Sequence, residues 1–159
     1  MSTEIENLII RKATLADTFT LVEHRNRFLE ELYNFCFQDL KIIAHNNQNY
    51  YKEKLAEGNY IALLAEYNGN PVASTGMILK EFPQKGIEKK RIVATVVSVY
   101  THPEYRKNGI AEKLINEMVA EARKSGISKL ELLATPNGET VYKKAGFKEP
   151  DDRYLELYL

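Results

Sequence analysis

The chain has 159 residues, and its 22 basic and 22 acidic side chains cancel to a formal net charge of zero at pH 7. A neutral chain has no global field that attracts nucleic acid or an anionic membrane, so any polyanion must be bound locally. The single cysteine, Cys36, excludes an internal disulfide, and no apolar run is long enough to span a membrane. This length suits one domain, which we expect over residues 1–159. Because the first residues also lack a secretion signal, we expect the protein in the reducing cytoplasm.

The first third of the chain predicts a strand followed by two helices. Residues 7–14 begin with a short apolar run, and Thr14 with Asp17 has the spacing of a helix-capping box. The second helix is expected to end near Glu57, before Gly58.

Three consecutive antiparallel strands are expected next. Residues 59–67 and 72–80 are apolar runs separated by an Asn68-Gly69 turn, which predicts a β-hairpin. After a charged loop, residues 91–101 are rich in β-branched side chains and predict a central strand.

The last third alternates helices and strands. Apolar residues from Ile110 to Ala122 recur at helical spacing and predict a helix that ends before Gly126. A strand over 128–135, a short helix stopped by Gly146 and a final strand over 153–159 should follow. The order indicates an α/β fold, in which the strands on either side of the Ile110 helix pair in parallel through a right-handed crossover.

The segment 106–111, with the sequence RKNGIA, has the features of an anion site. It follows the β-branched strand and opens a strongly periodic helix, whose first N–H groups have no intrahelical partner. Gly109 and Ala111 would allow close approach of a phosphate, and Arg106 and Lys107 supply charge. An ordinary strand-to-helix turn with a solvated cationic rim remains the alternative on spacing alone.

Other phosphate and metal motifs are missing from the sequence. There is neither a Gly-x-x-x-x-Gly-Lys-Ser/Thr loop nor a Gly-x-Gly-x-x-Gly segment after a strand, which disfavours nucleotide triphosphate hydrolysis and Rossmann dinucleotide binding. His24, His45 and Cys36 have no partners at metal-ligand spacing, so we expect no metal.

Two motifs together resemble the GNAT superfamily of N-acetyltransferases. Residues 96–115 resemble its acetyl-coenzyme A signature, with RKNGIA in the Arg/Gln-x-x-Gly-x-Gly/Ala position, and residues 130–149 resemble its second motif, with Tyr-x-x-x-Gly-Phe. The resemblance implies a GNAT fold. This is a mixed, mostly antiparallel central sheet with helices on both faces and a V-shaped split between the two central parallel strands.

The resemblance also implies a donor site for acetyl-coenzyme A. The backbone N–H groups of the phosphate loop would hold the pyrophosphate, and the pantetheine arm would pair with the end of the central strand at Val99 and Thr101. The amide of Val99 would polarise the thioester carbonyl. The loop residues concerned are Arg106, Lys107, Asn108, Gly109, Ile110 and Ala111.

The second motif implies a general acid. Tyr142 matches the family tyrosine that protonates the departing thiolate, although a packing role is the alternative for one of ten tyrosines. Thr135 stands where many relatives have an asparagine that contacts the pantetheine or the tyrosine, and Asn137 is a weaker replacement.

The general base is not evident in the sequence. Some relatives use a glutamate on the central strand, but the matching residue is Thr95. Glu30, Glu31 and Glu81 are weaker candidates, since each is better explained as a solvated surface charge. An acceptor that is already deprotonated, or a water chain to bulk, would remove the need for a base.

Three further features have a functional and a structural interpretation. His102 can relay a proton or restrain a turn before Pro103. The basic loop 85–91 can steer an anion or be solvated. Four aromatic residues can line an acceptor site or pack the helices on the sheet: Tyr33, Phe35, Tyr50 and Tyr51.

The function implied is N-acetyl transfer from acetyl-coenzyme A to a primary amine of a small molecule or peptide. A non-catalytic coenzyme A-binding regulatory module is the first alternative, because Thr95 replaces the glutamate. A toxin-like enzyme acting on aminoacyl-tRNA is the second, and the zero net charge argues against it and against nucleic acid as a partner. Dimers are common in the family, so a homodimer remains open.

Overall fold

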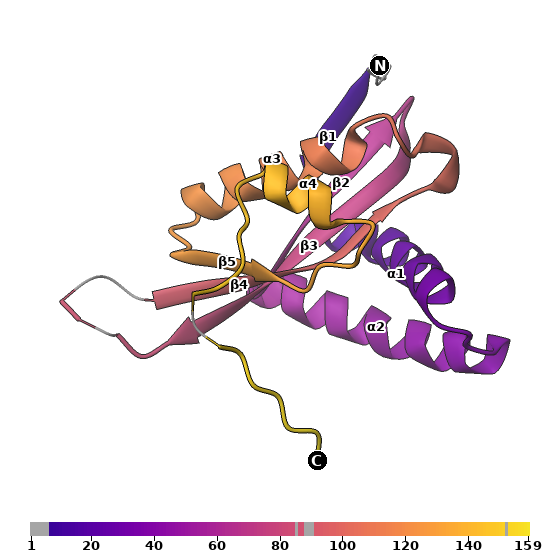
Figure 1. Cartoon of the computed structure of the whole chain (residues 1–159). Coiled ribbons are helices and arrows are strands. Elements are labelled where there is room, and N and C mark those ends of the chain that lie inside the picture. Colours follow the sequence, from indigo (N-terminus) through magenta and orange to yellow (C-terminus); the bar gives the residue numbers. More distant parts are fainter. Residues whose placement is uncertain (1–6, 85, 88–90, 152) are drawn as a thin grey trace.

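The computed structural model describes residues 7–84, 86–87, 91–151 and 153–159. Its centre is one five-stranded sheet in the order β1-β2-β3-β4-β5 (Figure 1). The first four strands pair antiparallel, and β4 pairs with β5 in parallel. The predicted antiparallel arrangement of β2, β3 and β4 and the predicted parallel pair are confirmed. The strands are β1 (Leu8–Lys12), β2 (Tyr60–Tyr67), β3 (Asn70–Phe82), β4 (Arg91–Thr101) and β5 (Lys129–Leu132).

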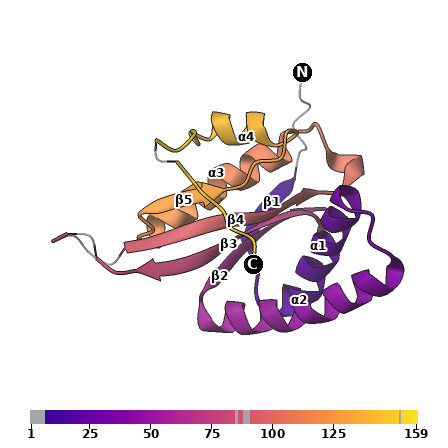
Figure 2. The same ribbon diagram turned by 60° about the horizontal axis from the view of Figure 1, so that its bottom comes forward.

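Helices cover both faces of this sheet (Figure 2). The helices α1 (Thr18–Leu32) and α2 (Phe37–Glu57) lie on one face, and α3 (Ile110–Lys124) and α4 (Glu139–Lys144) on the other. Short 3-10 turns at Leu15–Asp17 and Pro103–Tyr105 precede α1 and α3. No described helix is long and apolar enough to cross a membrane. The predicted mixed sheet between helical layers is confirmed.

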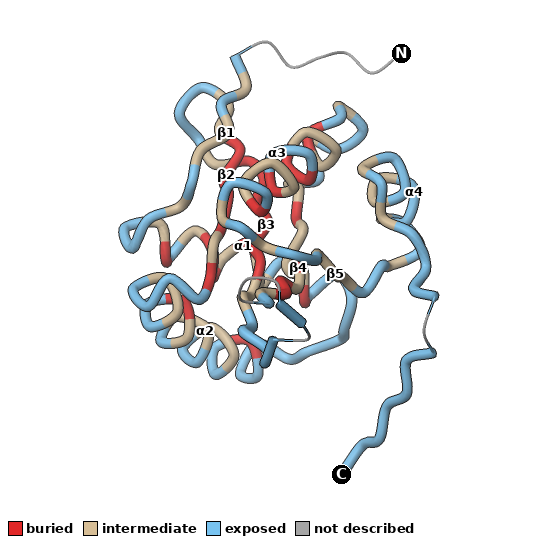
Figure 3. Tube along the Cα trace, turned by 90° about the vertical axis from the view of Figure 1, so that its left-hand side faces the viewer, coloured by how far each residue is buried: buried red, intermediate tan, exposed pale blue. Residues whose placement is uncertain are grey.

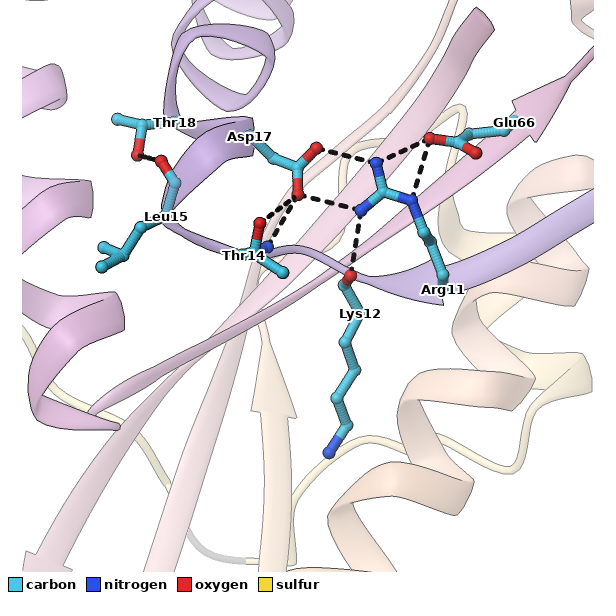
Figure 4. A network of polar contacts seen from close by, with 7 residues as sticks. All are labelled: Arg11, Lys12, Thr14, Leu15, Asp17, Thr18 and Glu66. Carbon is cyan, nitrogen blue, oxygen red and sulfur yellow. Dashed lines mark hydrogen bonds and ion pairs between the residues drawn. The ribbon is translucent and has the colours of Figure 1, made fainter. Parts of the chain in front are cut away.

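A polar network ties the end of β1 to the start of α1 (Figure 4). The Arg11 guanidinium contacts both carboxylate oxygens of Asp17, at 2.7 and 2.9 Å, and donates from Nε to Glu66 at 2.9 Å. Asp17 also accepts from the Thr14 amide at 2.7 Å, which confirms the predicted capping interaction. The hydrogen bonds from Arg11 lower the pKa of Asp17 to about 2.

Two apolar clusters hold the layers together, one on each face of the sheet. Figure 3 shows buried residues in the strands and in the helices that cover them. The predicted stripe of α3 is buried against Met77 and Val96. On the opposite face, Leu21 and Tyr51 pack on Tyr60 and Leu64. Each helix pair therefore buries its apolar face on the sheet, which is the main stabilising contribution in such a fold.

The predicted final strand is absent. Residues 153–159 adopt no regular structure and are exposed (Figure 3), although their sequence has the alternating pattern of a strand. Alternation gives a strand only where a neighbouring strand supplies hydrogen bonds, and this segment pairs with no strand in the described part of the chain. The expected strand over 128–135 is also shorter, because β5 ends at Leu132.

Candidate functional site

The parallel strands β4 and β5 part near their carboxyl ends. Their pairing ends at Val96 and Leu132, whereas β4 continues to Thr101. At the same point Ser98 has a φ of 55°, and the register with β3 shifts opposite it, between Ser74 and Gly76. Such a bulge bends a strand away from its neighbour. The V-shaped split predicted from the family resemblance is therefore present.

Val99 and Thr101 lie on β4 beyond the last residue pair with β5. Thr101 pairs with Ala73 of β3. Val99 lies in the bulged segment and packs on the apolar cluster under α3. Along this stretch, the edge of β4 on the β5 side has no strand partner among the described residues. An extended guest that pairs like a strand requires such an edge.

The loop after β4 is built to expose backbone amides. Lys107 and Gly109 have positive φ values of 64° and 74°, and the Asn108 side chain donates to the carbonyls of Tyr105 and Arg106, both at 3.1 Å. The first hydrogen bond of α3 runs from the Lys113 amide to the Gly109 carbonyl at 3.0 Å.

The amides of the first turn therefore have no acceptor within the helix. No side chain caps this end among the described residues. The residues concerned are Ile110, Ala111 and Glu112. Unpaired amides and the positive end of the helix dipole together favour an anion here.

The sequence predicts that Arg106 supplies charge beside a bound anion, but in the structure other groups of the protein hold its side chain. Its Nε donates to the Thr101 carbonyl at 2.8 Å, its Nη2 pairs with Glu31 of α1 at 2.5 Å, and the guanidinium lies 5.8 Å from the Tyr100 ring centre. The side chain thus braces the loop against α1. Lys107 is exposed and has no ion-pair partner in the described part of the chain, so it is the cation of this loop that is free to meet an anion.

Tyr142 lies on α4 and is half-buried beside Phe147, with ring centres 6.1 Å apart. Burial raises its pKa, so its phenol is protonated at neutral pH. Its hydroxyl has no hydrogen-bond partner within residues 7–84, 86–87, 91–151 and 153–159. The Thr135 carbonyl accepts from the amides of Gly138 and Glu139 and starts α4, while Asn137 is exposed in the same turn.

A carboxylate absent from the sequence-based site contacts Thr95. The Thr95 hydroxyl donates to Glu131 Oε1 at 3.2 Å, because the parallel register places these two residues side by side. Lys129, 3.0 Å away, and Thr95 together hold the pKa of Glu131 below its usual range. Since Ala94 and Val96 face the cluster under α3, Thr95 between them faces the side of α1 and α2. Only the strand register could have indicated this contact.

The contacts of His24 and His102 are those of structural residues. His24 is buried with its Nδ1 2.9 Å from Ser74 Oγ, and burial lowers its pKa to about 4. His102 donates its amide to Val72 and holds the turn, but its Nδ1 is buried without a partner among the described residues. That same part of the chain contains no His, Cys, Asp or Glu group suited to a metal ion.

The remaining candidates separate into two groups. Tyr50 and Tyr51 pack with Tyr60 between α2 and the sheet, as a structural role requires. Tyr33 and Phe35 are exposed at the junction of α1 and α2. Of the basic loop 85–91, residues 85 and 88–90 lie outside the described residues.

Comparison with known proteins identifies the family of this fold. Residues 20–147 match the model of the acetyltransferase (GNAT) family. The chain belongs to this family. It is 31% identical to a predicted acetyltransferase of Clostridium acetobutylicum whose crystal structure contains acetyl-CoA, with a TM-score of 0.81 over 95% of this chain and 96% of that one.

A second solved structure shares the fold, and curated proteins are similar in sequence. A GCN5-related N-acetyltransferase of Ralstonia eutropha is 23% identical, with a TM-score of 0.79 over 95% of this chain and 99% of that one. Among curated proteins, an uncharacterised N-acetyltransferase of Methanocaldococcus jannaschii is 27% identical over 92% of this chain and 68% of its own length. One of Pyropia yezoensis is 36% identical over 59 residues, which are 36% of this chain and 34% of that protein.

Proposed function

We propose that this GNAT protein transfers the acetyl group of acetyl-coenzyme A to a primary amine of a small molecule or peptide. The observation that supports this most directly is the combination of unpaired amides at the start of α3 with the split between β4 and β5. The first fits a diphosphate and the second fits an extended arm. The Clostridium relative, which aligns over 95% of this chain and 96% of its own, was solved with acetyl-CoA.

The donor would lie along the loop and then between the strands. The amides from Lys107 to Ala111 would hold the pyrophosphate, and the Lys107 side chain would add charge. Arg106 would act indirectly, because its guanidinium is held by Thr101 and Glu31 and keeps the loop in place. The arm would pair with β4 at Val99 and Thr101, and it would pass Thr135 and Asn137 on the opposite side of the split.

The acceptor amine would attack the thioester carbon directly. The Val99 N–H would stabilise the oxyanion, since one well-placed donor contributes on the order of 3 kcal/mol to the transition state. As the C–N bond forms and the C–S bond breaks, the Tyr142 hydroxyl would donate its proton to the sulfur and be reprotonated by the nitrogen. A phenol kept protonated by burial suits that step.

Where the acceptor arrives as an ammonium ion, its extra proton would leave before the attack, through water on the side of α1 and α2. Glu131 supplies a carboxylate at Thr95, the position where some relatives have a glutamate. Its lowered pKa makes it a weak base, so we assign it no required role and expect an acceptor with an amine that is deprotonated in part. The exposed thiol of Cys36 is stable in a reducing compartment, which favours the cytoplasm.

A non-catalytic coenzyme A-binding module is the second candidate, and Thr95 in place of a carboxylate favours it. Calorimetric titration with coenzyme A, followed by thiol release from acetyl-coenzyme A with polyamines, amino acids, aminoglycosides and peptides, separates the two. We expect binding and amine-dependent thiol release. Binding without thiol release from any amine would favour the module, and no binding by folded protein would overturn both.

A further inference from the structure

A cation lies on the side of α1 that faces the sheet. Leu21 and Leu29 of this helix are buried, and Arg25 lies between them at the same helical spacing, where the apolar period favours another apolar side chain. The helix packs beside β3 and β4 (Figure 2). Arg25 is half-buried there, so its side chain extends towards the strands.

The Arg25 guanidinium lies at the bulge of β4. Its Nη1 donates to Ser98 Oγ at 3.3 Å, and its central carbon lies 5.5 Å from the centre of the Phe28 ring. Ser98 has the φ of 55° and directly precedes Val99, whose amide is the proposed oxyanion donor. The cation is therefore next to the position proposed for the thioester, on the side of α1 and α2.

Within the described residues, no carboxylate pairs with Arg25. Of the carboxylates on its own helix, Glu23 pairs with Arg27 at 2.8 Å. Glu31 pairs with Arg106 of the loop after β4. A neutral hydroxyl compensates a guanidinium only weakly, whereas an ionised partner gives a stronger hydrogen bond. The surroundings of Arg25 thus favour an anion.

A buried phenol lies close to the same place. Tyr60 is 2% exposed, and its hydroxyl fills the space over Gly76, where any Cβ would collide with it. Gly76 pairs with Val97 of β4, the residue before Ser98. Burial raises the pKa of Tyr60 and the charge of Arg25 opposes this, so the guanidinium is within electrostatic reach of the hydroxyl. The phenol stays neutral and gives Arg25 no counter-charge.

We propose, on the basis of the acetyl transfer proposed above, that Arg25 binds the carboxylate of the acceptor and that the acceptor is a free amino acid. A carboxylate accepts two parallel hydrogen bonds from a guanidinium, which balances its single negative charge. Because strand residues are about 3.3 Å apart, a carboxylate at Ser98 would lie within roughly 7 Å of a thioester held at Val99. This spacing suits an amine and a carboxylate joined by one carbon, and it is too short for a peptide of several residues.

Thiol release from acetyl-coenzyme A tests the proposal with amino acids and their carboxamides, compared at equal concentrations of unprotonated amine. We expect kcat/KM of the wild type to be roughly 30-fold higher for the preferred amino acid than for its carboxamide, as charged hydrogen bonds contribute. Arg25→Gln should lose this preference by lowering kcat/KM for the amino acid only, and Arg25→Lys should retain part of it. Arg27→Gln removes an exposed arginine of the same helix and should keep the wild-type preference.

Calorimetry separates the possible failures. All four proteins should bind coenzyme A equally, and the coenzyme A complex of the wild type, but not that of Arg25→Gln, should bind the N-acetyl amino acid product. A wild type that acetylates amines without preferring carboxylates would overturn the assignment of Arg25 and leave the proposed function standing. Equal losses on both acceptors in Arg25→Gln would show a bracing role and overturn the assignment as well. No acetyl transfer to any amine would overturn both proposals.

Discussion

At the scale of single residues, the proposed donor site depends on Gly109. Its φ of 74° turns the chain into α3, and nothing lies within 4 Å of where a Cβ would stand. Backbone conformation, and not side-chain space, is therefore the reason for glycine here. Gly126, at the other end of α3, has a similar φ of 69° and equally open surroundings.

This similarity allows a matched test. Gly109→Ala and Gly126→Ala should each reduce the free energy of unfolding by about 1 kcal/mol, because alanine is strained in the left-handed region. Only Gly109→Ala should weaken coenzyme A binding, by roughly tenfold, because it shifts the amides of the first turn. Calorimetry and urea unfolding measure both effects, and equal binding by the two variants would contradict the assignment of the loop.

Tyr142→Phe should lower the rate of acetyl transfer at saturating substrates by roughly 100-fold, the usual contribution of a general acid. Coenzyme A affinity and stability should change little, since the hydroxyl has no hydrogen-bond partner in the described residues and the ring still packs on Phe147. Rapid-quench measurement of a single turnover isolates this step. An unchanged rate would assign Tyr142 a packing role only.

The site residues show which kind of inference the sequence supports. The loop 106–111 was predictable because a helix start and a glycine are local features. The partners of Arg106 and Thr95 were not, because Glu31 is 75 residues from Arg106 and Glu131 is 36 from Thr95. Such contacts depend on how α1 crosses the sheet and on the strand register, which no local pattern encodes.

At the scale of elements, the attachment of α1 to the sheet includes a buried titratable group. His24 is 3% exposed and contacts Ser74 of β3. Burial lowers its pKa from 6.5 to about 4, and nearby Arg27 and His102 act in the same direction, while Glu23 opposes them. The imidazole is therefore neutral in the folded chain at pH values where the unfolded chain binds a proton.

This difference predicts how stability depends on pH. The contribution of His24 is fully present above pH 6.5 and is lost as the pH falls toward 4, by an amount on the order of 2–3 kcal/mol. Urea unfolding at pH 7, 5.5 and 4.5 should show this loss. His24→Asn should have a lower free energy of unfolding at pH 7, and that free energy should change less with pH in this range. The control His45→Asn, at an exposed position, should keep the wild-type dependence on pH. Equal slopes for the three proteins would contradict the assignment.

The elements themselves were largely predictable because their signals are local. The apolar period of α3 and the Asn68-Gly69 turn each determine an element within a few residues. The final strand was wrongly predicted because a strand also needs a partner. The split at Ser98 followed from the family resemblance alone, since a serine gives no local sign of a positive φ.

At the scale of the whole molecule, the sheet separates two groups of helices and opens at one place. The helix α3 packs on one face and presents its first turn beside the end of β4, while α1 on the other face reaches the same loop through Glu31 and Arg106. Donor and acceptor would thus meet at the split from opposite sides. A shift of α1 would therefore move the loop 106–111, because the ion pair between Glu31 and Arg106 joins them.

Amide hydrogen exchange, followed by nuclear magnetic resonance with and without saturating acetyl-coenzyme A, tests this arrangement most directly. We predict that protection increases at the amides from Lys107 to Glu112 and at Val99 and Thr101, with little change in β1 and β2. Binding that protects other segments and leaves these amides unchanged, or no binding at all, would contradict the account.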